Sequence, residues 1–160
     1  MSNKLLSLCI VREGDKVLLG MKKRGFGAGF WNGFGGKVEP GETIEQGARR
    51  ELQEEAGIVA ASLTQVGRID FDFVDDPVRL EVHVFLVDGF TGIPMETEEM
   101  RPQWYDLAAI PYEKMWLDDR YWLPLALEGK LFKGRFLFRG TDKIVEYALE
   151  TDPQAAVLAS

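Results

Sequence analysis

The sequence predicts an α/β fold in which a mixed β-sheet is covered by helices on both faces. Three observations support this prediction: many short apolar runs with strand-like alternation, two separated amphipathic helices, and a length of 160 residues, near the usual size of one domain. The hydrophobic content of 46% and the aromatic content of 11% exclude wholesale disorder. We expect residues 1–160 to form a single domain with one core.

The strands are predicted from period-two alternation bounded by turn residues. They fall at residues 5–11, 16–21, 63–74, 80–88, 103–106, 133–139 and 143–149. Breaks are expected at Gly14-Asp15 and over residues 89–92, where glycine favours turns. For residues 152–160, and 153–160 above all, we expect a frayed tail or a weak helix.

The first helix has clear signals at both ends. Thr43 followed by Gln46 is a capping box, which predicts a helix beginning near Ile44, and Gly57 is suited to end it in a left-handed conformation. The apolar residues recur every fourth position, at Ile44, Ala48, Leu52 and Ala56. This stripe predicts one buried side of the helix.

The second helix is predicted from about residue 118 to residue 128. Asp118 or Asp119 can cap its first turn, and Gly129 can end it. Trp122, Leu125 and Ala126 are expected to point inward.

The first helix also carries an acidic flank. At about 100° per residue, Glu51, Glu54 and Glu55 fall on an arc of about 100°. Such carboxylates repel one another unless a cation lies among them, and oxygen ligands of this kind suit a hard divalent ion. Arg50 lies one turn before Glu54 and is expected to brace it and keep it ionised. For an isolated glutamate triplet, a solvated surface is the commoner interpretation.

The spacing of this segment is more specific than the triplet alone. Residues 36–58 read GKVEPGETIEQGARRELQEEAGI and match G-x5-E-x7-R-E-U-x-E-E-x-G-U at every fixed position, where U is a bulky aliphatic residue. The chain therefore resembles the Nudix hydrolases. This resemblance implies a Nudix-type α/β/α sandwich with two main helices, and Mg2+-dependent cleavage of nucleoside diphosphates linked to another group.

Outside this box, the chain resembles the animal MutT-type branch of the family, which hydrolyses oxidised purine nucleoside triphosphates. The similar segments are residues 20–29, 31–38, 82–85, 99–102, 115–116 and 118–119, so the resemblance covers nearly the whole chain. It implies conversion of 8-oxo-dGTP, 2-hydroxy-dATP and related modified purines to monophosphate and pyrophosphate, which prevents mutagenic incorporation into DNA. A Nudix hydrolase of another nucleoside diphosphate derivative is the alternative.

The resemblance also implies a base pocket. Asn32, Asp118 and Asp119 would bind the purine edge and Trp116 would lie against the ring; the remaining pocket residues would be Ser7, Leu8, Lys22, Phe26, Gly35, Phe71, Phe73, Leu80 and Trp122. A guanine edge offers two donors, which suit carboxylate acceptors. Because two adjacent carboxylates in an aromatic cavity do not both ionise readily, we expect one to hold a proton, which would admit oxidised adenine as well.

The implied cofactor is Mg2+, with Mn2+ as a substitute. Its ligands would be Glu51, Glu54, Glu55, a carbonyl near Gly36 and the distant Glu99, and the same four glutamates are the catalytic candidates. The sequence does not choose a general base among Glu51, Glu54 and Glu55, nor a direct or water-mediated role for Glu99.

Ordinary structural roles remain open for several of these residues. Asp118-Asp119 can be a plain helix start, Phe71 and Phe73 fit a half-buried strand, and Trp116 and Trp122 fit a core. His83 is expected to be a packed strand residue rather than a catalyst, and residues 22–24 can form a solvated turn.

The net charge and the cysteine content limit which partners and which cellular compartment are expected. The net charge of −7 argues against wrapping a nucleic-acid polymer, so a modified purine nucleoside triphosphate is the expected partner. A lone cysteine, Cys9, in an apolar run cannot form an internal disulfide and suits a reducing compartment. We expect a cytoplasmic monomer without a membrane span, with the mitochondrial matrix or the nucleus as alternative locations.

Overall fold

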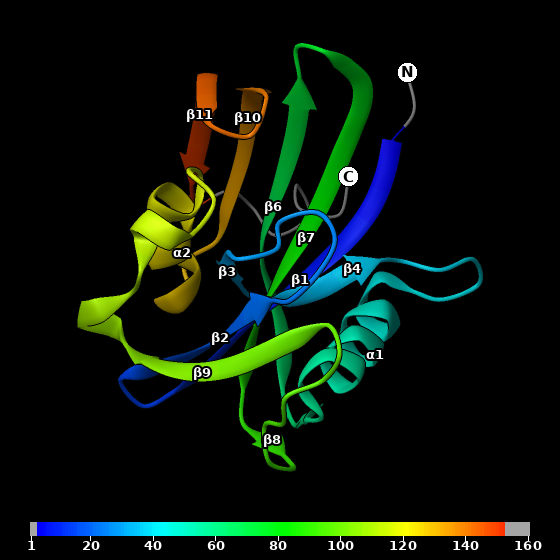
Figure 1. Ribbon diagram of the computed structural model, residues 1–160, viewed down its shortest axis with the longest axis vertical. Coiled ribbons are helices and arrows are strands. Elements are labelled where there is room, and N and C mark those ends of the chain that lie inside the picture. Colours follow the sequence, from blue (N-terminus) through cyan, green and yellow to red (C-terminus); the bar gives the residue numbers. More distant parts are fainter. Residues whose placement is uncertain (1–2, 153–160) are drawn as a thin grey trace.

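The computed structural model describes residues 3–152 (Figure 1). The main elements along the chain are β1 (Asn3–Glu13), β2 (Lys16–Lys22), β3 (Trp31–Asn32), β4 (Phe34–Lys37), α1 (Ile44–Ala56), β5 (Val59–Ala60), β6 (Leu63–Phe73), β7 (Asp76–Asp88), β8 (Phe90–Thr91), β9 (Met100–Asp106), α2 (Asp119–Leu127), β10 (Phe132–Arg139) and β11 (Lys143–Thr151). Two short 3-10 turns, Leu107–Ala109 and Tyr112–Lys114, precede α2. The tail predicted for residues 153–160 lies outside the described residues.

Nine of the strands in residues 3–152 form one mixed sheet. Its order is β11-β10-β6-β7-β1-β2-β3, with β4 added to β1 and β9 added to β2. The pairs β1 with β7 and β10 with β6 are parallel, and the other neighbours are antiparallel. Every strand predicted from alternation is confirmed, with ends that differ by a few residues.

The two helices cover opposite faces of this sheet (Figure 1). Along β1, Cys9 and Val11 pack into the apolar cluster that contains α1, whereas Ile10 packs into the cluster that contains α2. This follows from the alternation of side chains along a strand. The predicted α/β/α sandwich is confirmed, and the expected single core is instead two apolar layers because the sheet runs between them.

The signals predicted for α1 are present in the structure. The Thr43 hydroxyl accepts the Gln46 N–H at 3.1 Å, and the Gln46 side chain accepts the Thr43 N–H at 2.7 Å. Gly57 ends the helix with a φ of 73°. Three residues of the predicted stripe, Ala48, Leu52 and Ala56, are fully buried, so this helix is fixed tightly to the sheet.

Four short strands were not predicted: β3, β4, β5 and β8. β8 lies within the break expected over residues 89–92. Each of the four spans two to four residues, which is too short for a period of its own, and each exists because it pairs with a neighbour. No helix in residues 3–152 is both long and apolar enough to cross a bilayer.

We predict that Leu52→Ala lowers the free energy of unfolding by about 2–5 kcal/mol, because it empties a fully buried volume between α1 and the sheet. Urea unfolding followed by circular dichroism measures the loss. Gln53→Ala, on the exposed side of the same helix, is the control and should change stability by less than about 0.5 kcal/mol. Equal losses from the two variants would contradict the assigned packing of α1.

Candidate functional site

A cavity of about 260 Å³ opens on the α2 side of the sheet. It is lined by every residue that the family resemblance placed around the base: Ser7, Leu8, Lys22, Phe26, Asn32, Gly35, Phe71, Phe73, Leu80, Trp116, Asp118, Asp119 and Trp122. These residues come from segments far apart in the sequence. The structure therefore brings the whole set together, although their roles toward a ligand remain predictions.

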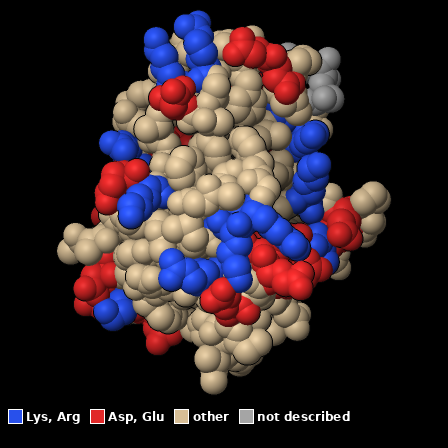
Figure 2. Space-filling model, viewed as in Figure 1, with Lys and Arg blue, Asp and Glu red and all other residues tan. Residues whose placement is uncertain are grey.

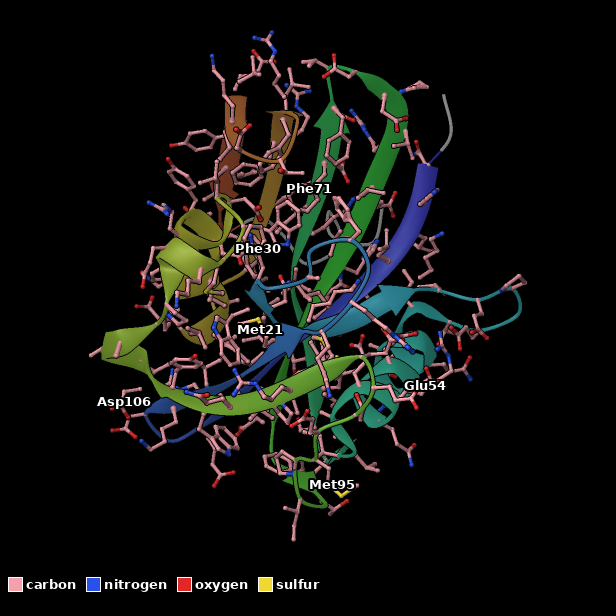
Figure 3. The ribbon with its side chains drawn as sticks, in the orientation of Figure 1. Met21, Phe30, Glu54, Phe71, Met95 and Asp106 are labelled. Atoms are coloured by element: carbon pink, nitrogen blue, oxygen red, sulfur yellow. The ribbon has the colours of Figure 1, made fainter. Side chains whose placement is uncertain are left out.

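Aromatic rings form much of the cavity wall. Trp116 stacks on Phe26 at a centroid distance of 5.3 Å and meets the edge of Phe30 at 5.1 Å. The ring centroids of Phe71 and Phe138 are 6.1 Å apart (Phe30 and Phe71 are labelled in Figure 3). Phe26 is 66% exposed, so it covers the mouth of the cavity rather than its interior. Flat apolar surfaces of this kind suit a planar heterocycle.

Two buried carboxyl groups lie among these rings. Asp118 is 3% exposed and Asp119 is 6% exposed. Burial raises the pKa of both, and the pKa of Asp119 rises further because of the adjacent Asp118 charge. Of the two carboxyl groups, Asp119 is therefore the one that holds a proton more readily, and the expectation that one of the pair is protonated remains a prediction.

The expected capping role of this pair is wrong. Asp118 occupies the N-cap position of α2, but its side chain makes no capping hydrogen bond. Its Oδ2 instead accepts the indole N–H of Trp122 at 2.7 Å. This bond keeps the carboxylate in the wall of the cavity. A capping hydrogen bond would instead have directed it toward the backbone N–H groups at the start of the helix.

Close backbone contact joins the cavity to β4. A Cβ on Gly35 would lie 1.9 Å from the carbonyl oxygen of Ser7, so only glycine lets β4 approach β1 at this point. The Ser7 hydroxyl is buried and has no hydrogen-bond partner among residues 3–152. It therefore has unused capacity to donate or accept at the border of the cavity.

Arg50 organises the acidic flank of α1. Its guanidinium donates to Glu51 at 2.7 Å and to Glu42 at 2.8 Å, and more weakly to Glu54 at 3.3 Å. Figure 2 shows Lys and Arg side chains directly beside the acidic side chains in this part of the surface. The predicted brace on Glu54 is present, but the stronger partners are Glu42 and Glu51, which alternation and spacing alone did not identify.

Glu55 lies apart from that network. One of its carboxylate oxygens accepts the Gly35 N–H at 2.8 Å, and among the acidic residues of α1 it alone lines the cavity within the described chain. Burial, and then the negative charge of Glu51, raise the pKa of Glu55 to about 8. Lys22 and the Gly35 N–H act in the opposite direction without cancelling this shift.

Glu99 immediately precedes β9 and is held from the β2 side. Arg24 donates to one Glu99 oxygen from Nε at 3.0 Å and from Nη2 at 2.7 Å. This pairing lowers the pKa of Glu99, so the carboxylate stays ionised. The charge of Glu99 also contributes to the raised pKa of Glu55, which places both groups in one electrostatic site.

The arrangement fits a hard cation by its donor chemistry. Within residues 3–152, no three carboxylate, histidine or cysteine side chains converge as a ready metal site. Arg50 holds Glu51, the Gly35 N–H holds Glu55, and Arg24 holds Glu99. A Cβ on Gly36 would lie 2.8 Å from the Glu51 carboxylate, so the bare backbone leaves room for oxygen ligands there. A cation near Glu55 would relieve the repulsion that raises its pKa. The ligand roles of Glu51, Glu54, Glu55, Glu99 and Gly36 remain predictions.

Some residues of the cavity were not predicted. Leu6, Gly33, Ile69, Val82, Met100, Phe138 and Gly140 also line it. Phe138 could have been predicted from the sequence, because it alternates with Phe136 on a predicted strand and so lies on the same face. Gly140 lies in a turn, and no sequence pattern pointed to it. His83 is 1% exposed and contacts Gln65 and Glu81, which confirms a packed strand residue.

Known proteins resemble this chain in sequence and in structure. The NUDIX domain model matches residues 5–126. The Oxidized purine nucleoside triphosphate hydrolase of Danio rerio is 54% identical over 93% of this chain and 96% of its own, and that of Mus musculus is 53% identical over 92% and 95%. The crystal structure of a MutT protein from Bacillus halodurans superposes with a TM-score of 0.83 at 25% identity, over 92% of this chain and 97% of that one. The chain therefore belongs to the NUDIX domain family.

Proposed function

We propose that this protein hydrolyses oxidised purine nucleoside triphosphates, including 8-oxo-dGTP and 2-hydroxy-dATP, to monophosphate and pyrophosphate. The observation that carries the proposal is a single cavity lined both by Asn32 and the Asp118-Asp119 pair and by Glu55 and Gly36 of the box. The two relatives named as Oxidized purine nucleoside triphosphate hydrolase support it. Such a reaction converts a damaged nucleoside triphosphate, the form that a polymerase uses, into a monophosphate.

Base selection follows from the donors and acceptors of the cavity. The N–H and amino groups of an oxidised guanine are donors, so an ionised Asp118 suits them as an acceptor. A protonated Asp119 is a donor and suits a ring nitrogen or a carbonyl oxygen. Asn32 can donate and accept, and Trp116 offers an aromatic face. Exchange of the proton within the aspartate pair lets one cavity bind oxidised guanine and oxidised adenine.

The oxygen ligands for Mg2+, or Mn2+ in its place, would come from Glu51, Glu54, Glu55 and Glu99 and from the Gly36 carbonyl. When bound, the ion supplies charge neutralisation for phosphate oxygens and a water of lowered pKa. The chain's own residues prepare this region: Arg50 orients Glu51, the Gly35 N–H orients Glu55, and Lys22 adds positive charge beside the cavity.

Glu55 is best placed to accept a proton from the attacking water. It lines the cavity, whereas Glu51 and Glu54 are engaged by Arg50. A base must be ionised before it can accept a proton, and a cation beside Glu55 would lower its raised pKa and so favour the carboxylate form that this role requires. We also propose that the protein acts as a cytoplasmic monomer on free nucleotides, since its net charge of −7 disfavours a nucleic-acid polymer.

Incubation with 8-oxo-dGTP, dGTP or ADP-ribose tests the proposed substrate. We expect monophosphate and pyrophosphate from 8-oxo-dGTP at a kcat/KM at least about tenfold above that for dGTP, because the oxidised edge adds a hydrogen bond. Ion-exchange chromatography identifies the products, and chelation of divalent ions should abolish them. Faster cleavage of ADP-ribose would favour the alternative, a Nudix hydrolase of another nucleoside diphosphate derivative.

We predict that Asp119→Asn changes the ratio of kcat/KM for 8-oxo-dGTP and 2-hydroxy-dATP by about tenfold or more. An amide cannot exchange a proton with Asp118, so one of the two donor patterns loses a partner. Steady-state kinetics with both substrates, also for Asp118→Asn, measure the ratio. Asp75→Asn, in the exposed turn between β6 and β7, is the control. Equal losses on both substrates would count against the proton exchange.

We predict that Glu55→Gln lowers kcat by about 10²–10⁴-fold while product monophosphate binds with nearly unchanged affinity, because the amide cannot accept the proton. Single-turnover kinetics and calorimetry measure the two quantities. An unchanged rate at saturating Mg2+ would remove Glu55 from the reaction.

Glu55 also makes the stability of the metal-free protein depend on pH, and the Glu55→Gln variant should lack this contribution. The pKa of Glu55 is raised in the folded state from 4.5 to about 8, so the folded protein binds the extra proton and loses stability as pH rises between these values. The slope is at most about 1.4 kcal/mol per pH unit. Urea unfolding in chelator should show this slope for the wild type and a smaller slope for Glu55→Gln.

A further inference from the structure

Thr97 lies on the segment that connects β8 to β9 past the C-terminal end of α1 (Figure 1). Its hydroxyl donates to the backbone carbonyl of Glu55 at 3.3 Å. The same oxygen accepts the backbone N–H of Glu99 at 3.3 Å and that of Met100 at 3.1 Å. One side chain therefore joins the backbones of two glutamates that are far apart in the sequence.

These three bonds use the full capacity of the hydroxyl. A threonine oxygen has one donor hydrogen and two acceptor lone pairs, and all three have partners here. The Glu55 carbonyl belongs to the last turn of α1, where carbonyls have no partner within the helix. Thr97 thus supplies hydrogen-bond partners both to a carbonyl at the end of α1 and to two backbone N–H groups of the turn before β9.

The neighbouring contacts show what this hydroxyl adds. The Met95 N–H donates to the Ala56 carbonyl at 3.0 Å, which fixes the segment to α1 but stops short of Glu99. From the other side, Arg24 holds the Glu99 carboxylate and the Lys23 N–H donates to the Glu99 carbonyl at 2.8 Å. Those two contacts tie Glu99 to the end of β2, and Thr97 ties it to α1.

We propose that Thr97 is a positioning residue that sets the distance between Glu55 and Glu99, so that both carboxylates serve one divalent cation. This inference rests on the proposed function, in which these glutamates are ligands. Thr97 itself does not touch the cation. Loss of the hydroxyl keeps both carboxylates in the chain but lets the turn that carries Glu99 move relative to α1. The distance between Glu55 and Glu99 is then no longer fixed, so the affinity for the cation falls while base binding is retained.

The test compares Thr97→Val, which removes the hydroxyl at nearly constant shape, with Thr97→Ser, which keeps it. Mn2+ alone is titrated into each protein without nucleotide, and free Mn2+ is counted by electron paramagnetic resonance. We expect Thr97→Val to weaken Mn2+ binding by about tenfold and Thr97→Ser to stay within about twofold of wild type. In assays, Thr97→Val should need about tenfold more Mg2+ for half-maximal rate, with an unchanged affinity for product monophosphate.

Thr43→Val is the matched control, because it deletes a hydroxyl that caps the opposite end of the same helix. It should lower the melting temperature and leave Mn2+ affinity unchanged. Equal Mn2+ affinity of Thr97→Val and wild type would overturn the inference, as would an equal loss in Thr43→Val. If Thr97→Val does not melt cooperatively, Thr97→Ala makes the same deletion with less bulk. Failure of the wild type to bind Mn2+ would instead overturn the proposed metal site.

Discussion

The ion-pair network of Arg50 is the interaction on which the candidate site depends. Its guanidinium joins Glu42 in the loop before α1, Glu51 on the helix and the carbonyl of Lys37 at the end of β4. Without this cation, a helix with a row of carboxylates would repel its own flank and the loop beside it. With it, α1 lies close enough to β4 for Glu55 to accept a backbone N–H, and the acidic flank keeps one fixed shape.

Side chains along β1 and β7 point alternately to the two faces of the sheet, so each face has a different role. One face packs against α1 and carries the acidic helix, and the other, with α2, holds the aromatic cavity. The two regions meet at β4, which is short, rich in glycine and in contact with both β1 and α1. Small side chains are needed there because two functional regions and two backbones share one narrow space.

The sequence predicted the features that local patterns encode. The capping box at Thr43, the buried stripe through Leu52 and the long strands all follow from nearest-neighbour spacing and are present in the structure. The missed features depend on partners elsewhere in the fold. The short strands β3, β4, β5 and β8 exist only because they pair with neighbouring strands. The Asp118 side chain makes no capping hydrogen bond and accepts the indole N–H of Trp122 instead. The residues that the family resemblance placed around the base line one cavity, and their roles toward a ligand remain predictions. The pairing of Arg24 with Glu99 could be found only from the fold.

The buried position of Cys9 has a chemical consequence for a protein of this proposed activity. The thiol is fully buried, lies 3.6 Å from the Ala48 carbonyl, and has a pKa raised to about 12 chiefly by burial. Peroxides attack the thiolate, which is then almost absent, so the sulfur resists conversion to sulfenic acid. The same oxidative stress that damages nucleotides would therefore leave the only sulfhydryl of this enzyme intact.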